Sequence, residues 1–486
     1  MITLLILIPI LSIPFLLVFK DRKALGVISF GFALANFFVS VYLLQQFDFQ
    51  KTEFQFVESV LLVPNFSFYY KVGIDSISLW MVLLTTFLFP LVITGAYDSI
   101  KDKFQGYYIS LMILESSIIG AFVSLDLFLF YIFWELMLIP MFFIIGLWGG
   151  KDRIYATVKF VLFTMVGSLL MLIGIIYFIV AYNTFDYEKL LQIKLSFTEQ
   201  AYLFWLFAAA FLIKVPVAPV HTWLPDAHTE APAGGSVILA GILLKLGTFG
   251  LIRYNLPLFP EASLYFANLL AIIAVIGIVH GAFAAAVQPD IKRLIAYSSV
   301  SHMGFIVLGI FSFTVSGIQG SILQMINHAL STGALFFLVG MIYEHTHTRF
   351  IADYGGAAKW IPLYAVFFMI STLSSVGLPG LNGFVGEFTI LVSSYKVYPV
   401  LTIVAVSGVV LGAWYLLKAY GKVFYGESRN EEVKKHLKDM NLREMLTLIP
   451  MVILMFYLGL FPKPFFQSIE ASVKQHLEHL QKVNKE

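Results

Sequence analysis

The chain of 486 residues contains no cysteine. This absence excludes disulfide bonds, zinc sites with thiolate ligands and cysteine-ligated iron–sulfur clusters within the chain. If the protein works in a redox enzyme, its electron carriers must therefore be bound by other chains.

Charged residues are also scarce. They make up 12% of the chain, whereas hydrophobic residues make up 59% and the mean hydropathy is +0.87. Ordinary globular chains carry about 25% charged residues, because a soluble surface needs polar cover. This composition, together with repeated apolar runs of about 20 residues, indicates a polytopic membrane protein. A net charge of +2 gives no basis for nucleic-acid binding.

The N-terminal apolar run has neither preceding basic residues nor a small-residue cleavage site, so we interpret it as a retained first span rather than a signal peptide. The hydropathy pattern predicts fourteen spans in all. They cover residues 2–19, 25–46, 76–97, 107–124, 127–147, 155–180, 201–221, 231–254, 263–283, 294–312, 319–343, 361–394, 399–424 and 443–461.

Lysine and arginine are concentrated in the loops that follow odd-numbered spans. Lys20, Arg22 and Lys23 follow the first span, and Lys292 and Arg293 follow the ninth. Because cytoplasmic loops are enriched in these residues, we expect the odd loops to be cytoplasmic. Both termini are then expected on the outer side of the membrane.

Two blocks of five spans each contain a helix interrupted by proline. The interruption lies at Pro216 and Pro219 in spans 4–8, and at Pro379 in spans 9–13. An odd number of spans gives the second block the opposite topology, and inverted repeats with matched broken helices are typical of transporters. The predicted fold is all-α, with about 14 transmembrane helices and two inverted five-helix repeats. The predicted units are 1–106 (three N-terminal helices), 107–254 (first repeat), 263–424 (second repeat) and 425–486 (cytoplasmic connector, last span and tail).

The tail after Phe461 differs from the spans. Ile469, Val473, Leu477 and Leu480 follow helical spacing, with charged residues between them. This pattern predicts an amphipathic helix on the outer face of the membrane or against a partner, and a solvated tail is the alternative.

Five ionisable side chains lie deep within apolar spans, and these are Glu115, Glu135, Lys214, Lys245 and Glu387. A charge at a helix centre costs roughly 2.5–3.5 kcal/mol, so five unpaired charges would cost on the order of 12–17 kcal/mol. They must therefore be paired, hydrated or neutralised. Ionisable residues inside a membrane mark ion and proton pathways.

The stretch 205–228 carries the most informative of these charges. Lys214 precedes Pro216 and Pro219, which break the helix and free backbone carbonyls that can solvate an ammonium group. The chain stays apolar beyond it, which argues against a lysine that merely extends to the interface. Glu135 either forms a structural pair with a cation or takes part in charge transfer. We favour charge transfer, because apolar residues could replace a purely structural pair.

The other charges are less easily interpreted. Lys245 is central in the eighth span, whereas Arg253 is near the outer end of that span and is interpreted as an interface anchor. Glu387 follows Pro379 within the second broken helix. Glu115 is either an accessory carboxylate or a buried, hydrogen-bonded one, and the sequence favours neither.

Histidines extend this set. A single membrane histidine is often only a hydrogen-bonding group, but His302 and His328 lie on successive spans between Lys245 and Glu387 in sequence. Because the reference pKa of histidine is near neutrality, this arrangement favours a proton relay.

A second group, His221, Asp226, His228 and Glu230, lies at the inner end of the first broken helix. Its spacing matches no regular metal-ligand pattern. We therefore interpret it as a hydrated proton-access site, in preference to a metal site or a helix cap.

Three motifs carry a resemblance to a known family: KVPVAPVHTWLPDAHTEAP, IKRLIAYSSVSHMGF and LPGLNGFVGEF. They resemble the proton-translocating antiporter-like subunits of respiratory complex I, an NADH–quinone oxidoreductase, and the related chains of Mrp-type cation/proton antiporters. The resemblance covers nearly the whole chain. Glu387 and the short segment after the last span resemble one branch of the family, in which the second broken helix carries glutamate rather than lysine.

The resemblance implies a role for each buried charge. Glu135 and Lys214 would be the paired residues of a first half-channel, Lys245 the central connection and Glu387 the end of a second half-channel, with the two histidines between them. Protons would be taken up from the cytoplasm near 221–228, stored on Lys214, passed through Lys245 and the histidines to Glu387, and released outside.

The resemblance also implies a setting. The chain would be a non-redox subunit of a proton-translocating NADH:quinone oxidoreductase in the bacterial inner membrane. It would hold no cofactor, and NADH, FMN, iron–sulfur clusters and quinone would be bound by other subunits. The expected partners are neighbouring antiporter-like membrane subunits and the lipid bilayer. The alternatives are a subunit of an Mrp-type Na⁺/H⁺ antiporter, of a related membrane-bound hydrogenase complex or, with less support, a quinone-binding subunit.

Overall fold

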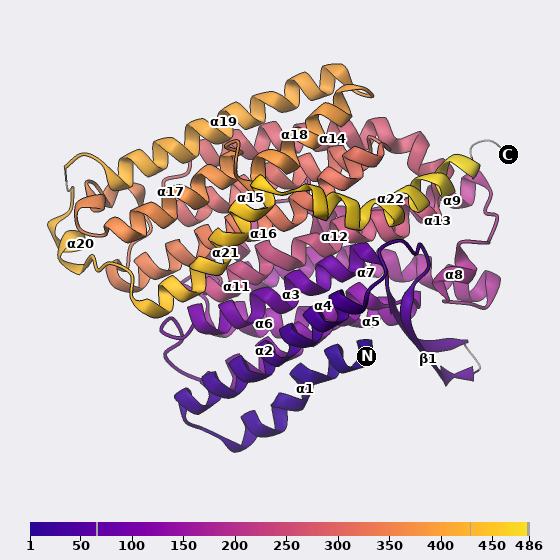
Figure 1. Ribbon diagram of the computed structural model, residues 1–486, viewed down its shortest axis with the longest axis horizontal. Coiled ribbons are helices and arrows are strands. Elements are labelled where there is room, and N and C mark those ends of the chain that lie inside the picture. Colours follow the sequence, from indigo (N-terminus) through magenta and orange to yellow (C-terminus); the bar gives the residue numbers. More distant parts are fainter. Residues whose placement is uncertain (65–66, 428, 484–486) are drawn as a thin grey trace.

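The computed structural model describes residues 1–64, 67–427 and 429–483, which form a bundle of roughly aligned helices (Figure 1). The helices of the N-terminal half are α1 (Ile2–Val18), α2 (Arg22–Gln46), α3 (Ser76–Gly95), α4 (Phe104–Val123), α5 (Leu127–Leu136), α6 (Leu138–Trp148), α7 (Arg153–Tyr182), α8 (Tyr187–Leu190), α9 (Phe197–Lys214), α10 (Trp223–Glu230), α11 (Ala233–Ile238), α12 (Leu244–Gly250) and α13 (Leu256–Leu258). Two π-helical segments, η2 (Leu239–Leu243) and η3 (Leu251–Asn255), join the last three into one continuous run.

The C-terminal half continues the bundle. Its helices are α14 (Pro260–Ala286), α15 (Ile291–Ile310), α16 (Val315–Thr346), α17 (Pro362–Val376), α18 (Asn382–Tyr395), α19 (Pro399–Phe424), α20 (Glu431–His436), α21 (Leu442–Leu460) and α22 (Lys463–Val483). Two 3₁₀ turns, η4 (Ile351–Asp353) and η5 (Ala357–Lys359), lie between α16 and α17.

All fourteen predicted spans are helical. Eleven segments of the described chain are long and apolar enough to cross a membrane. The other three are the shorter α1 and the two interrupted helices, α9 with α10 and α17 with α18. The protein is therefore a multi-pass, mostly helical membrane protein, as predicted.

Both interruptions lie at the predicted prolines. α9 ends at Lys214, because Pro216 has no N–H group with which to continue the helical hydrogen bonds. α17 ends just before Gly377, and Gly377 and Gly380 adopt left-handed backbone conformations on either side of Pro379. Such conformations favour glycine, so the sequence determines the second break as well as the first.

A two-stranded antiparallel hairpin is the part of the fold that the all-α prediction missed. β1 (Gln55–Val63) pairs with β2 (Phe68–Ile74) between α2 and α3. Lys71 on β2 donates to Asp186 at 2.7 Å and to Glu188 at 2.6 Å. Burial alone would lower the pKa of Lys71, but the hydrogen bonds and charges of the two carboxylates raise it above its usual value. These ion pairs attach the hairpin to α8.

The C-terminal tail forms the predicted amphipathic helix, α22. Ile469 and Val473 are fully buried, and α22 packs against α3, α13, α14 and α16 of the same chain. Trp80 on α3 donates to the Ser468 hydroxyl at 2.8 Å. The chain's own helices cover the apolar face of α22, and its place on the outer face of the membrane or against a partner stays a prediction.

α16 occupies the centre of the bundle. It has 32 residues and is buried over nearly its whole length. α11, η2, α15, α17, α18, α21 and α22 all pack against it. Small residues such as Gly320, Gly333 and Gly340 allow these neighbours to approach closely, as is usual between membrane helices. The second broken helix and the π-helical run therefore meet around α16.

The two ends of the bundle differ. The hairpin, α8 and the end of α22 lie on the right in Figure 1, and α20 lies at the opposite end. We call these the hairpin end and the α20 end. The division into units 1–106, 107–254, 263–424 and 425–486, and the side of the membrane that each end faces, stay predictions.

Candidate functional site

Lys214 is buried where the first broken helix ends. Its side chain is 1% exposed, and its Nζ has no hydrogen-bond partner among the described residues. Nζ lies 5.3 Å from the ring centre of Trp134 and 5.6 Å from that of Phe160. Cation–π contacts of this kind stabilise an ammonium group but leave its N–H donors unused. Lys214 therefore ties no other described side chain or backbone group into the fold through a hydrogen bond.

Glu135 is half-buried at the end of α5, next to Trp134 in sequence. Its Oε1 is buried and has no hydrogen-bond partner within the described ranges. Glu135 and Lys214 are close enough to act on each other electrostatically. The direct pairing that the resemblance implies is not formed, however, since Nζ of Lys214 has no hydrogen-bond partner among the residues that the structure describes.

Lys245 is completely buried in the π-helical run. Its Nζ lies 2.6 Å from Nδ1 of His328 and also contacts the backbone carbonyl of Ala240. Ala240 belongs to η2, and π-helical turns interrupt the regular helical hydrogen bonding and occur frequently at functional sites. The lysine is thereby held against α16 at the middle of the chain.

A line of side chains leads on from Lys245, and a ring contact rather than a hydrogen bond joins its two histidines. The ring centres of His328 and His302 are 5.8 Å apart, and Nδ1 of His302 lies 2.7 Å from Oε1 of Glu387. Gln324 donates to the same carboxylate oxygen at 2.9 Å, and the Ser375 hydroxyl lies 3.1 Å from Nε2 of His302. Helices α12, α15, α16, α17 and α18 each supply part of this line.

This line is expensive to bury. Lys245, His328, His302 and Glu387 are all less than 10% exposed. Burying a polar group without full hydrogen bonding costs about 1–3 kcal/mol, and a charged group costs more. Apolar residues would pack these positions at lower cost, so the arrangement indicates chemistry rather than packing.

The predicted cluster after the first break is divided, because His221 and Asp226 both face side chains of α15, Tyr297 and Arg293, whereas His228 faces α16. Nε2 of His221 lies 3.2 Å from Nε2 of His280 on α14. Asp226 accepts from Lys159 at 2.7 Å and pairs with Arg293 at 3.0 Å. His228 is fully buried elsewhere, and no group in the described part of the chain has three or more residues placed to hold a metal.

Glu115 lies apart from the other candidates, between α2 and α4. Asn36 donates to its Oε1 at 2.9 Å, and its Oε2 is buried without a partner among the described residues. The sequence left two interpretations of Glu115 open. This geometry favours the buried, hydrogen-bonded carboxylate over the accessory one.

Arg253 corrects a sequence-based interpretation. It is not an interface anchor, because it is 3% exposed and its Nη2 lies 2.5 Å from Oδ1 of Asp75. The rings of Phe54 and Phe249 lie 5.0 and 5.3 Å from its guanidinium carbon. The pair joins η3 to the start of α3.

Three polar side chains at these contacts were missed by sequence-based prediction. His280 lies in an apolar span, so the criterion that selected His302 should have selected it. Gln324 precedes His328 by four residues, which places both on one face of α16. Ser375 carries no comparable signal, because serine is common in membrane helices.

Known proteins share both the sequence and this architecture. Residues 124–412 match the family described as NADH:quinone oxidoreductase/Mrp antiporter, TM. The chain is 43% identical to NADH-quinone oxidoreductase subunit M of Rickettsia prowazekii over 479 residues, which cover 97% of each protein. It matches a chain of respiratory complex I from Thermus thermophilus with a TM-score of 0.90 and 32% identity, over 99% of this chain and 100% of that one. A chain of the Mrp complex from Dietzia sp. has the same fold, with a TM-score of 0.86 and 18% identity over 99% of both chains.

Proposed function

This chain belongs to the NADH:quinone oxidoreductase/Mrp antiporter transmembrane family, and on that premise we propose that it translocates protons as the subunit M component of a respiratory NADH–quinone oxidoreductase. One observation supports this most directly. A buried line of proton-exchanging groups runs from Lys245 through His328 and His302 to Glu387. Lysine, histidine and carboxylate side chains can each take up and release a proton, and together they form a relay through the apolar interior.

Sequence identity favours an NADH–quinone oxidoreductase over an Mrp-type antiporter as the complex to which the chain belongs. The 43% identity to the Rickettsia protein over nearly the full length supports the proposal that this chain is a subunit M. The 18% likeness to the Mrp chain concerns the fold alone. Glu387 supports the same choice, because the branch of the family that the sequence resembles carries glutamate rather than lysine in the second broken helix. An Mrp-type antiporter or a membrane-bound hydrogenase is therefore the weaker alternative.

The first half of the chain would control access to this relay. A carboxylate near an ammonium group favours its protonated form. When the negative charge of Glu135 is close, Lys214 holds its proton, and when that charge moves away or is neutralised, Lys214 releases it. Moving one charge against 100 mV costs about 2.3 kcal/mol, which is comparable to a change of about two units in a pKa. Electron transfer in other subunits would drive these changes in the position or charge of Glu135.

Other parts of the proposal concern the setting. NADH, FMN, iron–sulfur clusters and quinone would be held by other subunits, in keeping with the absence of cysteine from this chain. Neighbouring antiporter-like subunits would be its partners in the bacterial inner membrane. The α20 end would face the cytoplasm, and both termini would lie on the outer side, as the distribution of lysine and arginine indicates.

The test is proton transport by the whole complex in liposomes. We expect Glu387→Gln and Lys245→Ala to reduce NADH-driven proton flux several-fold, because each removes one proton-exchanging group from the relay. Glu432→Gln is the matched control, since Glu432 lies exposed on α20. Mass spectrometry of the purified complex verifies that each variant assembles. Normal flux in both relay variants would overturn the proposed function.

A further inference from the structure

The break in the second broken helix is held by contacts with two neighbouring helices. The side-chain oxygen of Asn382, the first residue of α18, accepts from the Ser374 hydroxyl of α17 at 2.6 Å. α21 packs directly on the break, because a Cβ on its Gly459 would lie 2.5 Å from the backbone of Gly380 and Leu381. These contacts fix the first turn of α18 relative to α17 and α21.

Asn327 of α16 connects this first turn with a neighbour of Glu387. Its side chain is fully buried, and its Nδ2 donates to the backbone carbonyl of Asn382 at 2.7 Å and to Oε1 of Gln324 at 3.1 Å. Nε2 of Gln324 in turn donates to Oε1 of Glu387 at 2.9 Å. A chain of hydrogen bonds therefore runs from the start of α18, through two amides of α16, to the carboxylate of α18.

A backbone carbonyl fixes the direction of this chain. Because a carbonyl oxygen can only accept, the group of Asn327 that faces Asn382 is its NH₂ group. The second hydrogen of that group needs an acceptor, so Gln324 turns its oxygen toward Asn327 and its own NH₂ group toward Glu387. In this conformation Gln324 can only donate to the carboxylate, and such a donor favours the ionised form of the carboxylate.

The two oxygens of Glu387 have different surroundings. Oε1 lies within hydrogen-bond distance of both Gln324 and His302. Oε2 lies beside the break, since a Cβ on Gly377 would be 3.6 Å from it. The carboxylate therefore lies between the amide that Asn327 orients and the backbone of the break.

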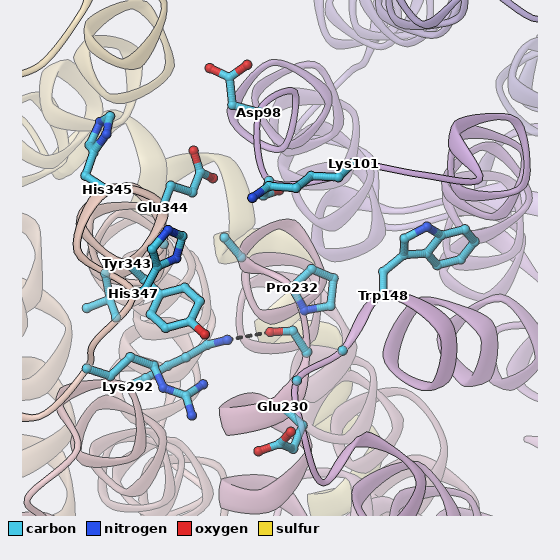
Figure 2. Close-up of a pocket in the computed structure, with 18 of the residues that line it drawn as sticks. Asp98, Lys101, Trp148, Glu230, Pro232, Lys292, Tyr343, Glu344, His345 and His347 are labelled. Carbon is cyan, nitrogen blue, oxygen red and sulfur yellow. Dashed lines mark hydrogen bonds between the residues drawn. The ribbon is translucent and has the colours of Figure 1, made fainter. Parts of the chain in front are cut away.

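This chain of hydrogen bonds is remote from the charged cavity at the α20 end of the bundle. The cavity has a volume of about 490 Å³, and Figure 2 shows Lys101, Glu230 and Glu344 among the residues that line it. Glu344 and Asn327 both belong to α16 and are seventeen residues apart, a rise of about 26 Å. Substitution of Asn327 therefore leaves the cavity and its charges in place.

We propose that Asn327 is a positioning residue that couples the geometry of the break to the protonation of Glu387. The inference rests on the proposed function of the chain. While α18 lies against α16, Asn327 holds Gln324 as a donor to Glu387. When the first turn of α18 moves away, Asn327 loses its carbonyl partner, and the Gln324 amide can turn its oxygen toward Glu387, where it accepts from the O–H group of the protonated carboxyl. The proton itself passes between Nδ1 of His302 and the carboxylate, and neither amide gains or loses one. A closed break thus favours proton release from Glu387, and an open break favours proton uptake.

The first test is a double-mutant cycle on NADH-driven proton flux in the reconstituted complex. Asn327→Leu and Gln324→Met each remove one link of the chain, and we expect each to reduce the flux several-fold. Because Asn327 acts through Gln324, the double variant should lose no more than Gln324→Met alone. Losses that multiply in the double variant would show that Asn327 acts independently and would overturn the proposal. Asn327→Ala, which adds no bulk, replaces Asn327→Leu in the cycle if leucine prevents assembly.

Gln319→Leu is the matched control for the loss of an amide. Gln319 also belongs to α16, and its amide donates to the backbone carbonyl of Phe466 at 3.0 Å. This bond joins α16 to α22 and lies outside the chain that leads to Glu387, so we expect normal flux. A loss as large as that of Asn327→Leu would mean that any missing amide contact of α16 impairs transport, and the positioning role would be wrong.

The second test observes Glu387 itself. In infrared difference spectra of the complex before and after reduction by NADH, the C=O stretching band of its protonated carboxyl is identified by its absence from Glu387→Gln. We expect Asn327→Leu to shift this band, because the orientation of the Gln324 amide changes. A merely structural role of Asn327 would leave the band where it is, which would contradict the proposal. The lack of any such band in the unmodified complex would also contradict it, since Glu387 would then exchange no proton.

These outcomes separate the positioning role from the proposed function. Normal flux in both Glu387→Gln and Lys245→Ala overturns the proposed function, and the positioning role fails with it. Reduced flux in those two variants, with normal flux in Asn327→Leu, leaves the function standing and overturns the positioning role. Reduced flux in Asn327→Leu, no further loss in the double variant and a shifted carboxyl band together support it.

Discussion

Neutralising Asp75 should destabilise the protein more than any surface substitution. Asp75 and Arg253 have side chains that are 4% and 3% exposed, and their charged atoms lie 2.5 Å apart. Asp75→Asn leaves the guanidinium buried without its counter-charge. Breaking a buried pair in this way costs about 3–5 kcal/mol. Asparagine is as good an N-cap as aspartate, so the cap that Asp75 forms on α3 with Ser78 is retained.

The free energy of unfolding is measured on the purified full-length chain in mixed micelles, by titration with a denaturing detergent. The double variant Asp75→Asn/Arg253→Met serves as the internal reference, because it removes the orphaned charge along with its partner. We expect it to recover most of the loss, since an apolar side chain of similar length can replace a buried ion pair. Glu432→Gln, which breaks an exposed pair with Lys435, should cost no more than about 0.5 kcal/mol.

Two results would refute this reasoning. A loss below about 1 kcal/mol for Asp75→Asn would place the pair with ordinary surface salt bridges. A double variant as unstable as the single one would mean that the buried charge is not the source of the cost.

Two further substitutions test contacts at the candidate site. Gly386→Ala should slow NADH-driven proton flux, because the new Cβ would collide with the Gln324 amide that donates to Glu387. Gly421→Ala, where a Cβ meets nothing within 4 Å, is the matched control and should be neutral. Asn36→Leu should lower the free energy of unfolding by about 1–3 kcal/mol, because it removes the donor to buried Glu115. Asn36→Leu/Glu115→Met should recover that loss in the same assay, and no recovery would show that the hydrogen bond is not responsible.

The spans, the two breaks and the buried charges could be predicted from the sequence because each has a strong local cause. A span is a long apolar run, a break follows from a proline that cannot donate, and a charge in such a run is conspicuous for its cost. For this reason Lys214, Lys245 and Glu387 were predicted correctly as buried groups.

Contacts between distant segments had no such local cause. The partner of Arg253 lies 178 residues away, so its position near the end of an apolar run could not distinguish a buried pair from an interface anchor. His221, Asp226 and His228 are neighbours in sequence, but the turn and helix that hold them direct His221 and Asp226 toward α15 and His228 toward α16. Sequence proximity suggested one site, whereas the fold separates His228 from the other two residues.

α16 has a consequence for how motion in this protein can be observed. The helix is unbroken over 32 residues, about 48 Å. α11, which follows the first interrupted helix, and both parts of the second, α17 and α18, pack against it. An uninterrupted, buried helix is stiff, whereas a helix with a proline break can pivot. α16 therefore provides a fixed coordinate axis inside the molecule. Probes placed on α10 and α18 would report rotation relative to that axis, so the two halves can be followed separately during turnover.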